Sequence, residues 1–143
     1  MEAWQTFIAN AQQLGQQAAG IYDFAISQAG DKLLAAGLDG TLRLWDIAST
    51  APMDAGMEQL LQVGVGQQTA VTSVALSPNG RLAAAGDAGG QVICWRVADG
   101  SLVQQWAAHV GRVRRVAFLP NSNGLLSIGD DGRLQLWELL TRD

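Results

Sequence analysis

Three tryptophans mark an internal repeat, and this repeat constrains the fold more than any other feature of the chain. Trp45, Trp95 and Trp137 each follow a short run in which apolar residues alternate with others. The first two lie 50 residues apart and the last two lie 42 residues apart. The same two spacings separate three earlier apolar segments, which begin at Ile21, Val71 and Val113. A fixed period of this length indicates an array of similar units that pack on their neighbours.

Three windows of the sequence align on this period without a gap. The windows are 21–47, 71–97 and 113–139, and they share alanine, glycine and tryptophan at fixed positions. Apolar residues alternate within them, as Phe24 and Ile26 do, which is the period of a strand with one buried face. The pattern predicts nine strands, at 21–27, 32–37, 41–47, 71–77, 82–86, 91–97, 113–119, 124–128 and 133–139.

Turn-forming residues separate the predicted strands. Asp-Gly or Gly-Gly pairs at 39–40, 89–90 and 131–132 predict two-residue type I′ hairpins, in which both central residues have a positive φ. Two further segments, 58–66 and 101–108, are expected to give the first and second units an outer fourth strand. We expect no such strand in the third unit, because few residues follow its tryptophan.

These residues resemble the WD-repeat family of β-propellers. Trp45 and Asp46 form the dipeptide that names the family, whereas arginine and glutamate follow the other two tryptophans. The resemblance implies an all-β fold with three WD-type blades, which is a partial propeller, at about 20–66, 67–108 and 109–143. It also implies a buried structural tetrad, complete only in the third unit, that consists of His109, Ser127, Asp131 and Trp137.

The first 19 residues have a different pattern and are expected to form a short N-terminal helix outside the blades. Trp4, Phe7 and Ile8 fall on one apolar stripe at helical spacing, and glutamines fall opposite. We expect this stripe to be the interface of an amphipathic helix over about 2–18. The alternative is that the segment forms an outer strand that closes a ring, as one terminus often does in this family.

Charge and cysteine content exclude several classes of function. The chain has nine basic and thirteen acidic residues, so its net charge of −4 does not favour nucleic acid or anionic membranes as partners. No apolar run is long enough to span a membrane, and the N-terminus lacks the pattern of a secretory signal. The single cysteine, Cys94, is expected to be buried and inert. We therefore expect a cytoplasmic protein, and the preference for arginine over lysine suggests a GC-rich bacterial gene.

No catalytic, cofactor or metal site is expected. His109 is the only histidine, so a zinc site of the usual kind lacks ligands. Ser127, His109 and Asp131 form a catalytic triad on paper, but the resemblance places them inside a blade, where they satisfy one another. The segment VGVGQQT at 63–69 lacks the lysine and third glycine of phosphate-binding loops.

An arginine cluster is the sharpest local feature of this acidic chain. Arg112, Arg114 and Arg115 bracket valines that are expected to be buried, so the arginines should face solvent. Tyr22 stands at the repeat position of Arg114. The resemblance places such positions near the central channel, where partners commonly bind, and arginine and tyrosine are enriched in binding hot spots. We expect these four residues to bind a protein partner; the alternative is a solvated loop cluster.

Three blades leave two apolar sheet faces without a neighbouring blade. Closed propellers have more blades than three, and large bare apolar faces are interfaces or aggregation hazards. We therefore expect a non-enzymatic scaffold or assembly subunit. Its open faces would be covered by a second copy in a six-bladed ring, or by a larger complex, with Leu134, Leu136 and Leu139 or their counterparts in the first blade near the contact. The alternative is a small-molecule-binding or catalytic propeller that forms only after oligomerisation.

Overall fold

The computed structural model describes residues 21–37, 41–46, 58–62, 70–121 and 123–138. The predicted N-terminal helix, with its interface residues Trp4, Phe7 and Ile8, lies outside the described residues, as does Leu139. Within these ranges the fold consists of strands and turns.

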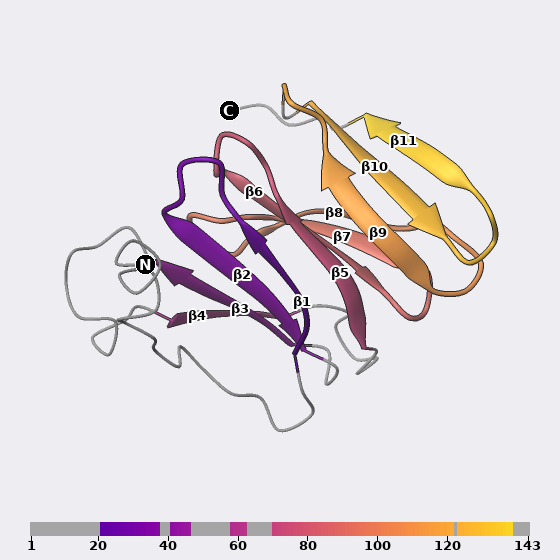
Figure 1. Ribbon diagram of the computed structural model, residues 1–143, viewed down its shortest axis with the longest axis horizontal. Coiled ribbons are helices and arrows are strands. Elements are labelled where there is room, and N and C mark those ends of the chain that lie inside the picture. Colours follow the sequence, from indigo (N-terminus) through magenta and orange to yellow (C-terminus); the bar gives the residue numbers. More distant parts are fainter. Residues whose placement is uncertain (1–20, 38–40, 47–57, 63–69, 122, 139–143) are drawn as a thin grey trace, which may run out of the picture.

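Three antiparallel sheets stand side by side and share no strand (Figure 1). Blade 1 has the order β1-β2-β3-β4, blade 2 the order β5-β6-β7-β8, and the described part of blade 3 the order β9-β10-β11. The strands are β1 (Ile21–Ile26), β2 (Lys32–Gly37), β3 (Thr41–Asp46), β4 (Glu58–Gln62), β5 (Val71–Leu76), β6 (Leu82–Asp87), β7 (Gln91–Arg96), β8 (Leu102–Ala107), β9 (Val113–Phe118), β10 (Gly124–Gly129) and β11 (Leu134–Glu138). All nine expected strands are present to within one residue at either end, and β4 and β8 are the two expected outer strands.

The hairpin turn between β6 and β7 differs from the type I′ turn that its glycine pair predicts. Between β6 and β7, the N–H of Gly90 donates to the carbonyl of Asp87 at 3.3 Å, so the turn spans four residues. Gly90 has a φ of +92°, whereas its neighbour Gly89 is not among the glycines with positive φ. A carboxylate oxygen of Asp87 also accepts hydrogen bonds from the N–H groups of Gly89 and Gln91. One left-handed residue is therefore enough, because an aspartate caps the turn.

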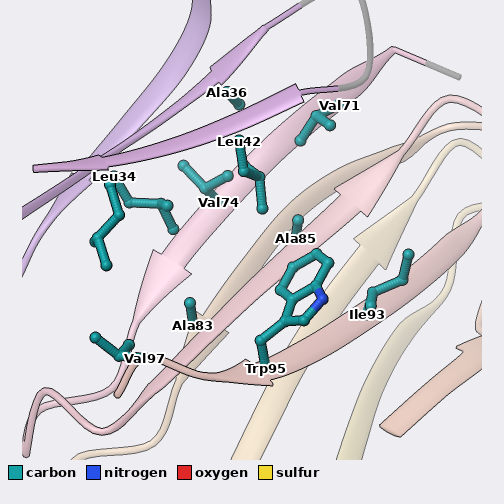
Figure 2. Close-up of a cluster of buried hydrophobic side chains, with 11 residues drawn as sticks. Leu34, Ala36, Leu42, Val71, Val74, Ala83, Ala85, Ile93, Trp95 and Val97 are labelled. Carbon is teal, nitrogen blue, oxygen red and sulfur yellow. The ribbon is translucent and has the colours of Figure 1, made fainter. Parts of the chain in front are cut away.

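Hydrophobic packing lies between the blades, because each sheet has two apolar faces. Figure 2 shows Leu34, Ala36 and Leu42 of blade 1 facing Val74 and Trp95 of blade 2. Strand pairing explains the division: in β1 and β2, Ala25 lies opposite Leu34 on this face, and Phe24 lies opposite Ala35 on the other. The alternating residues of β1 therefore belong to two different faces.

A second apolar layer joins blades 2 and 3. Val113 and Val116 of β9 and Leu125 of β10 are buried against Ala75 and Val92 of blade 2. Cys94 lies fully buried next to Leu82, at the border of this layer. The two layers hold three inner strands side by side, since β5 contacts both β1 and β9.

Candidate protein-binding surfaces

Four side chains join the end of β8 to blade 3. The Nδ1 atom of His109 lies 3.0 Å from a carboxylate oxygen of Asp131, and its Nε2 atom lies 2.8 Å from Oγ of Ser127. The Nε1–H of Trp137 donates to the same Oγ at 2.8 Å. The structure thus brings together the four residues that the family resemblance selects, on β10, β11 and the loops that flank blade 3.

The hydrogen bonds within this group can form one continuous series of donors and acceptors. If the Nδ1–H of His109 donates to Asp131, its Nε2 atom accepts the Ser127 hydroxyl proton, and that oxygen accepts from Trp137. The ring nitrogens of His109, the Ser127 hydroxyl and the indole N–H of Trp137 then all have partners within this group. Ser127 is 1% exposed and the His109 side chain is buried, so the serine has no access to a substrate.

Backbone N–H groups stabilise the ionised form of the Asp131 carboxyl group. Partial burial acts to raise its pKa, but hydrogen bonds from the N–H groups of Val110 and Arg133, and from His109, outweigh this effect. The pKa of Asp131 therefore lies below its usual value of 3.8. The ionised carboxylate acts as a clamp, because it accepts hydrogen bonds from Val110 in the linker between β8 and β9 and from Arg133 at the β10–β11 turn.

The arginine cluster divides into two parts. Arg114 Nη1 lies 3.0 Å from a carboxylate oxygen of Asp130, and Arg112 Nε lies 3.4 Å from the other oxygen. Both pairs are at the surface. Arg115 instead lies opposite Ile128 of β10, on the face of blade 3 that points away from blade 2. Tyr22 is half exposed on β1.

One open face belongs to blade 1. Phe24 and Ile26 alternate along β1 and are 62% and 52% exposed, although residues at the same repeat positions in β5 are packed against blade 1. Blade 1 therefore presents large apolar side chains to solvent on this face.

The other open face belongs to blade 3. Leu134 and Leu136 on β11 are 69% and 64% exposed, and Leu136 lies opposite Leu126 of β10. A shallow pocket of about 190 Å³ lies on this face, and Arg115 is the one charged residue in its lining. The sequence predicts Leu134 and Leu136 near an uncovered face, and both side chains are exposed on this face.

A groove at the junction of blades 1 and 2 was not expected from the sequence. It has a volume of about 560 Å³, with Leu44, Leu82 and Val97 as apolar lining. Lys32, Arg81 and Arg96 also line it. These cations are far apart in the sequence, so only the packing of two blades reveals their proximity.

The described residues contain no group of three histidine, cysteine, aspartate or glutamate side chains placed to hold a metal ion. No helix among them is long and apolar enough to cross a bilayer.

Known relatives match parts of the chain. A pre-rRNA-processing protein IPI3 of Mycosarcoma maydis is 33% identical over 69 residues, which are 48% of this chain and 12% of that protein. The WD repeat-containing protein 91 of Gallus gallus is 30% identical over 118 residues, which are 82% of this chain and 15% of that protein. The meiotic recombination protein rec14 of Schizosaccharomyces pombe is 29% identical over 118 residues, 82% of this chain and 36% of that protein.

The chain thus spans a small fraction of the length of these relatives. All three are eukaryotic and lend no support to a bacterial source. The model of the WD domain, G-beta repeat, matches residues 10–46, 58–96 and 100–138. The second match begins at the outer strand β4, and the third begins just before the outer strand β8. Together with the three antiparallel sheets, these matches show that the chain belongs to the WD-repeat family.

Proposed function

We propose that the chain is a non-enzymatic scaffold or assembly subunit whose two open blade faces are covered by protein. WD repeats point to protein–protein interaction, and the observation that carries this proposal is the pair of exposed apolar faces at opposite ends of the row of blades. Each internal junction buries such a face completely, as Leu34 and Leu125 show at 0% exposure. The same kind of face left in water at both ends is a strong drive for association.

The interior polar groups support a structural role for the molecule. In the Ser-His-Asp arrangement of blade 3, Ser127 and His109 are buried, and all three side chains make hydrogen bonds within the molecule. It therefore stabilises the fold instead of acting on a substrate.

The exposed arginines provide a polar rim to the open face of blade 3. Arg112 and Arg114 share Asp130 and are solvated, so each contributes little on its own. Arg115 stands inside the apolar face and is the better candidate for a buried anchor. Tyr22 occupies the equivalent rim of blade 1.

A matched pair of substitutions tests the proposal. Leu134→Asp places a carboxylate on the open face of blade 3, and Leu102→Asp places one on the outer strand of blade 2, where leucine is 53% exposed. We expect natively extracted protein to run as a complex larger than a monomer in size-exclusion chromatography with light scattering. The Leu134 variant should lose this complex and the Leu102 variant should keep it. A monomer in all three samples would contradict the proposal.

A further inference from the structure

We propose that the open face of blade 3 receives a protein sheet that presents a carboxylate to Arg115 and a small side chain to Ile128. A second copy of this chain, through its blade 1, would then be the wrong partner. This inference rests on the proposed function and specifies the partner.

Both internal junctions contain the same polar contact. A carboxylate oxygen of Asp23 in blade 1 accepts a hydrogen bond from the N–H of Val74 in blade 2, at 3.0 Å. Oγ of Ser73 in blade 2 accepts one from the N–H of Val116 in blade 3, at 3.1 Å. Asp23 and Ser73 occupy the same repeat position, and so do Val74 and Val116. An acceptor on one blade thus satisfies a backbone donor on the next.

Blade 3 has Arg115 at the position of this acceptor. A guanidinium group donates hydrogen bonds and accepts none. Arg115 is exposed and has no hydrogen-bond or ion-pair partner among the described residues, unlike the neighbouring Arg114, which pairs with Asp130. The next sheet therefore has to supply an acceptor here.

The size of one side chain also distinguishes the open face of blade 3 from the faces buried at the internal junctions. At the junction of blades 2 and 3, a methyl group added to Gly86 would lie 2.3 Å from Cγ1 of Val113, so this position has no room for a side chain. The corresponding residue of blade 1 is Ala36, which is fully buried. In blade 3 the corresponding residue is Ile128. Its bulk stands where the internal junctions admit a neighbouring valine.

A second copy would fail on both counts. At the repeat positions of Val113 and Val116, blade 1 has Ile21 and Phe24. Docked as in the internal junctions, it would bring a β-branched residue against Ile128 and a backbone N–H against Arg115. Two donors would face each other, and an unpaired guanidinium would be buried, which is strongly unfavourable.

The pocket on this face indicates what does fit. Apart from Arg115 its lining is apolar or small, with Ala117, Leu126, Ile128 and Leu134 among the residues. A carboxylate paired with the guanidinium would form two charge-assisted hydrogen bonds in a desolvated setting. Apolar side chains around it would cover the leucines. The partner is therefore an apolar sheet face with one acidic residue at its inner strand.

Sedimentation of the purified full chain tests the exclusion of a second copy. We expect the wild-type chain to form no discrete dimer at micromolar concentration. The double variant R115S/I128G copies the serine and glycine of blade 2 onto blade 3, and we expect it to form dimers at least about tenfold more tightly. A discrete wild-type dimer, or an unchanged double variant that is folded by circular dichroism, would overturn the proposal.

A surrogate partner tests the carboxylate. In the I128G background, F24D places an acidic residue on the face of blade 1 that would meet Arg115 in a docked copy. We expect F24D to associate at least about tenfold more tightly than the isosteric F24N, and added R115Q to remove the difference. Equal association of the two variants would overturn the carboxylate requirement. The Leu134→Asp experiment tests the proposed function, whereas the F24D and F24N comparison tests only the carboxylate requirement.

Discussion

At the scale of single residues, Trp137 connects the polar and apolar parts of blade 3. Its indole N–H donates to Ser127, and its ring lies 5.4 Å from that of Trp106 in a tilted arrangement. We expect Trp137→Ala to lower the free energy of unfolding by about 3–5 kcal/mol, the usual effect of removing a large core aromatic.

The matched control for this change is Trp137→Phe, which keeps an aromatic ring but removes the donor. It should cost about 1–2 kcal/mol, the effect of one buried hydrogen bond. Urea denaturation followed by circular dichroism measures both variants. An alanine variant within about 1 kcal/mol of wild type would show that the tetrad does not stabilise blade 3.

Asp131 makes stability depend on pH. Its pKa is lower in the folded chain than its usual value of 3.8, so the ionised form stabilises the fold. This contribution is present at neutral pH and is lost as the pH falls below about 4, through the folded pKa. Urea midpoints measured from pH 7 to pH 3 should fall for the wild type. Asp131→Asn should start lower at pH 7 and change less over the same range; parallel curves would count against the clamp.

Cys94 is a buried thiol with little reactivity. Burial raises its pKa to about 12, although the charge of Arg96 acts in the opposite direction. Since the thiolate is the reactive species, an aromatic disulfide reagent at pH 8 should label the folded chain only through unfolding. Labelling should become rapid in denaturant. Rapid labelling of the native chain would mean that the junction of blades 2 and 3 opens readily.

At the scale of elements, the sequence predicts strands well and turns less well. Strand positions follow from the alternation of residues along each strand, because successive side chains point to opposite faces of a sheet. The turns depend on side-chain caps such as the carboxylate of Asp87, which the glycine pairs alone do not reveal. Alternation also does not assign Phe24 or Ile26 to a covered or an open face, because that depends on a neighbouring sheet.

Gly90 provides a test at this scale. It has a φ of +92°, and an added Cβ would lie 2.1 Å from the carbonyl oxygen of His109. Gly132 also has a positive φ, +78°, but open space surrounds it. Gly132→Ala should cost about 1–3 kcal/mol from backbone strain alone. Gly90→Ala should cost clearly more in thermal or urea unfolding, and equal losses would show that the linker to His109 moves aside without cost.

At the scale of the whole molecule, the repeat predicted the three blades and the need for covered faces. The four tetrad positions came from family resemblance, and their hydrogen bonds from the structure. Residue identity alone grouped Arg112, Arg114 and Arg115 together. The structure separates them, because Arg115 lies opposite Ile128 on the open face, whereas Asp130 pairs with Arg112 and Arg114 next to a register shift in β9. The groove with Lys32, Arg81 and Arg96 depends on contact between two blades, which no local pattern encodes.

The repeat in the sequence and the sheet in the structure are out of step by one strand. The matched segment 100–138 contains β8, which pairs with β7 of blade 2, as well as the three strands of blade 3. Removal of that segment would therefore damage two blades, since blade 2 would lose its outer strand. A sequence that gains or loses one repeat must re-pair an edge in the adjacent blade.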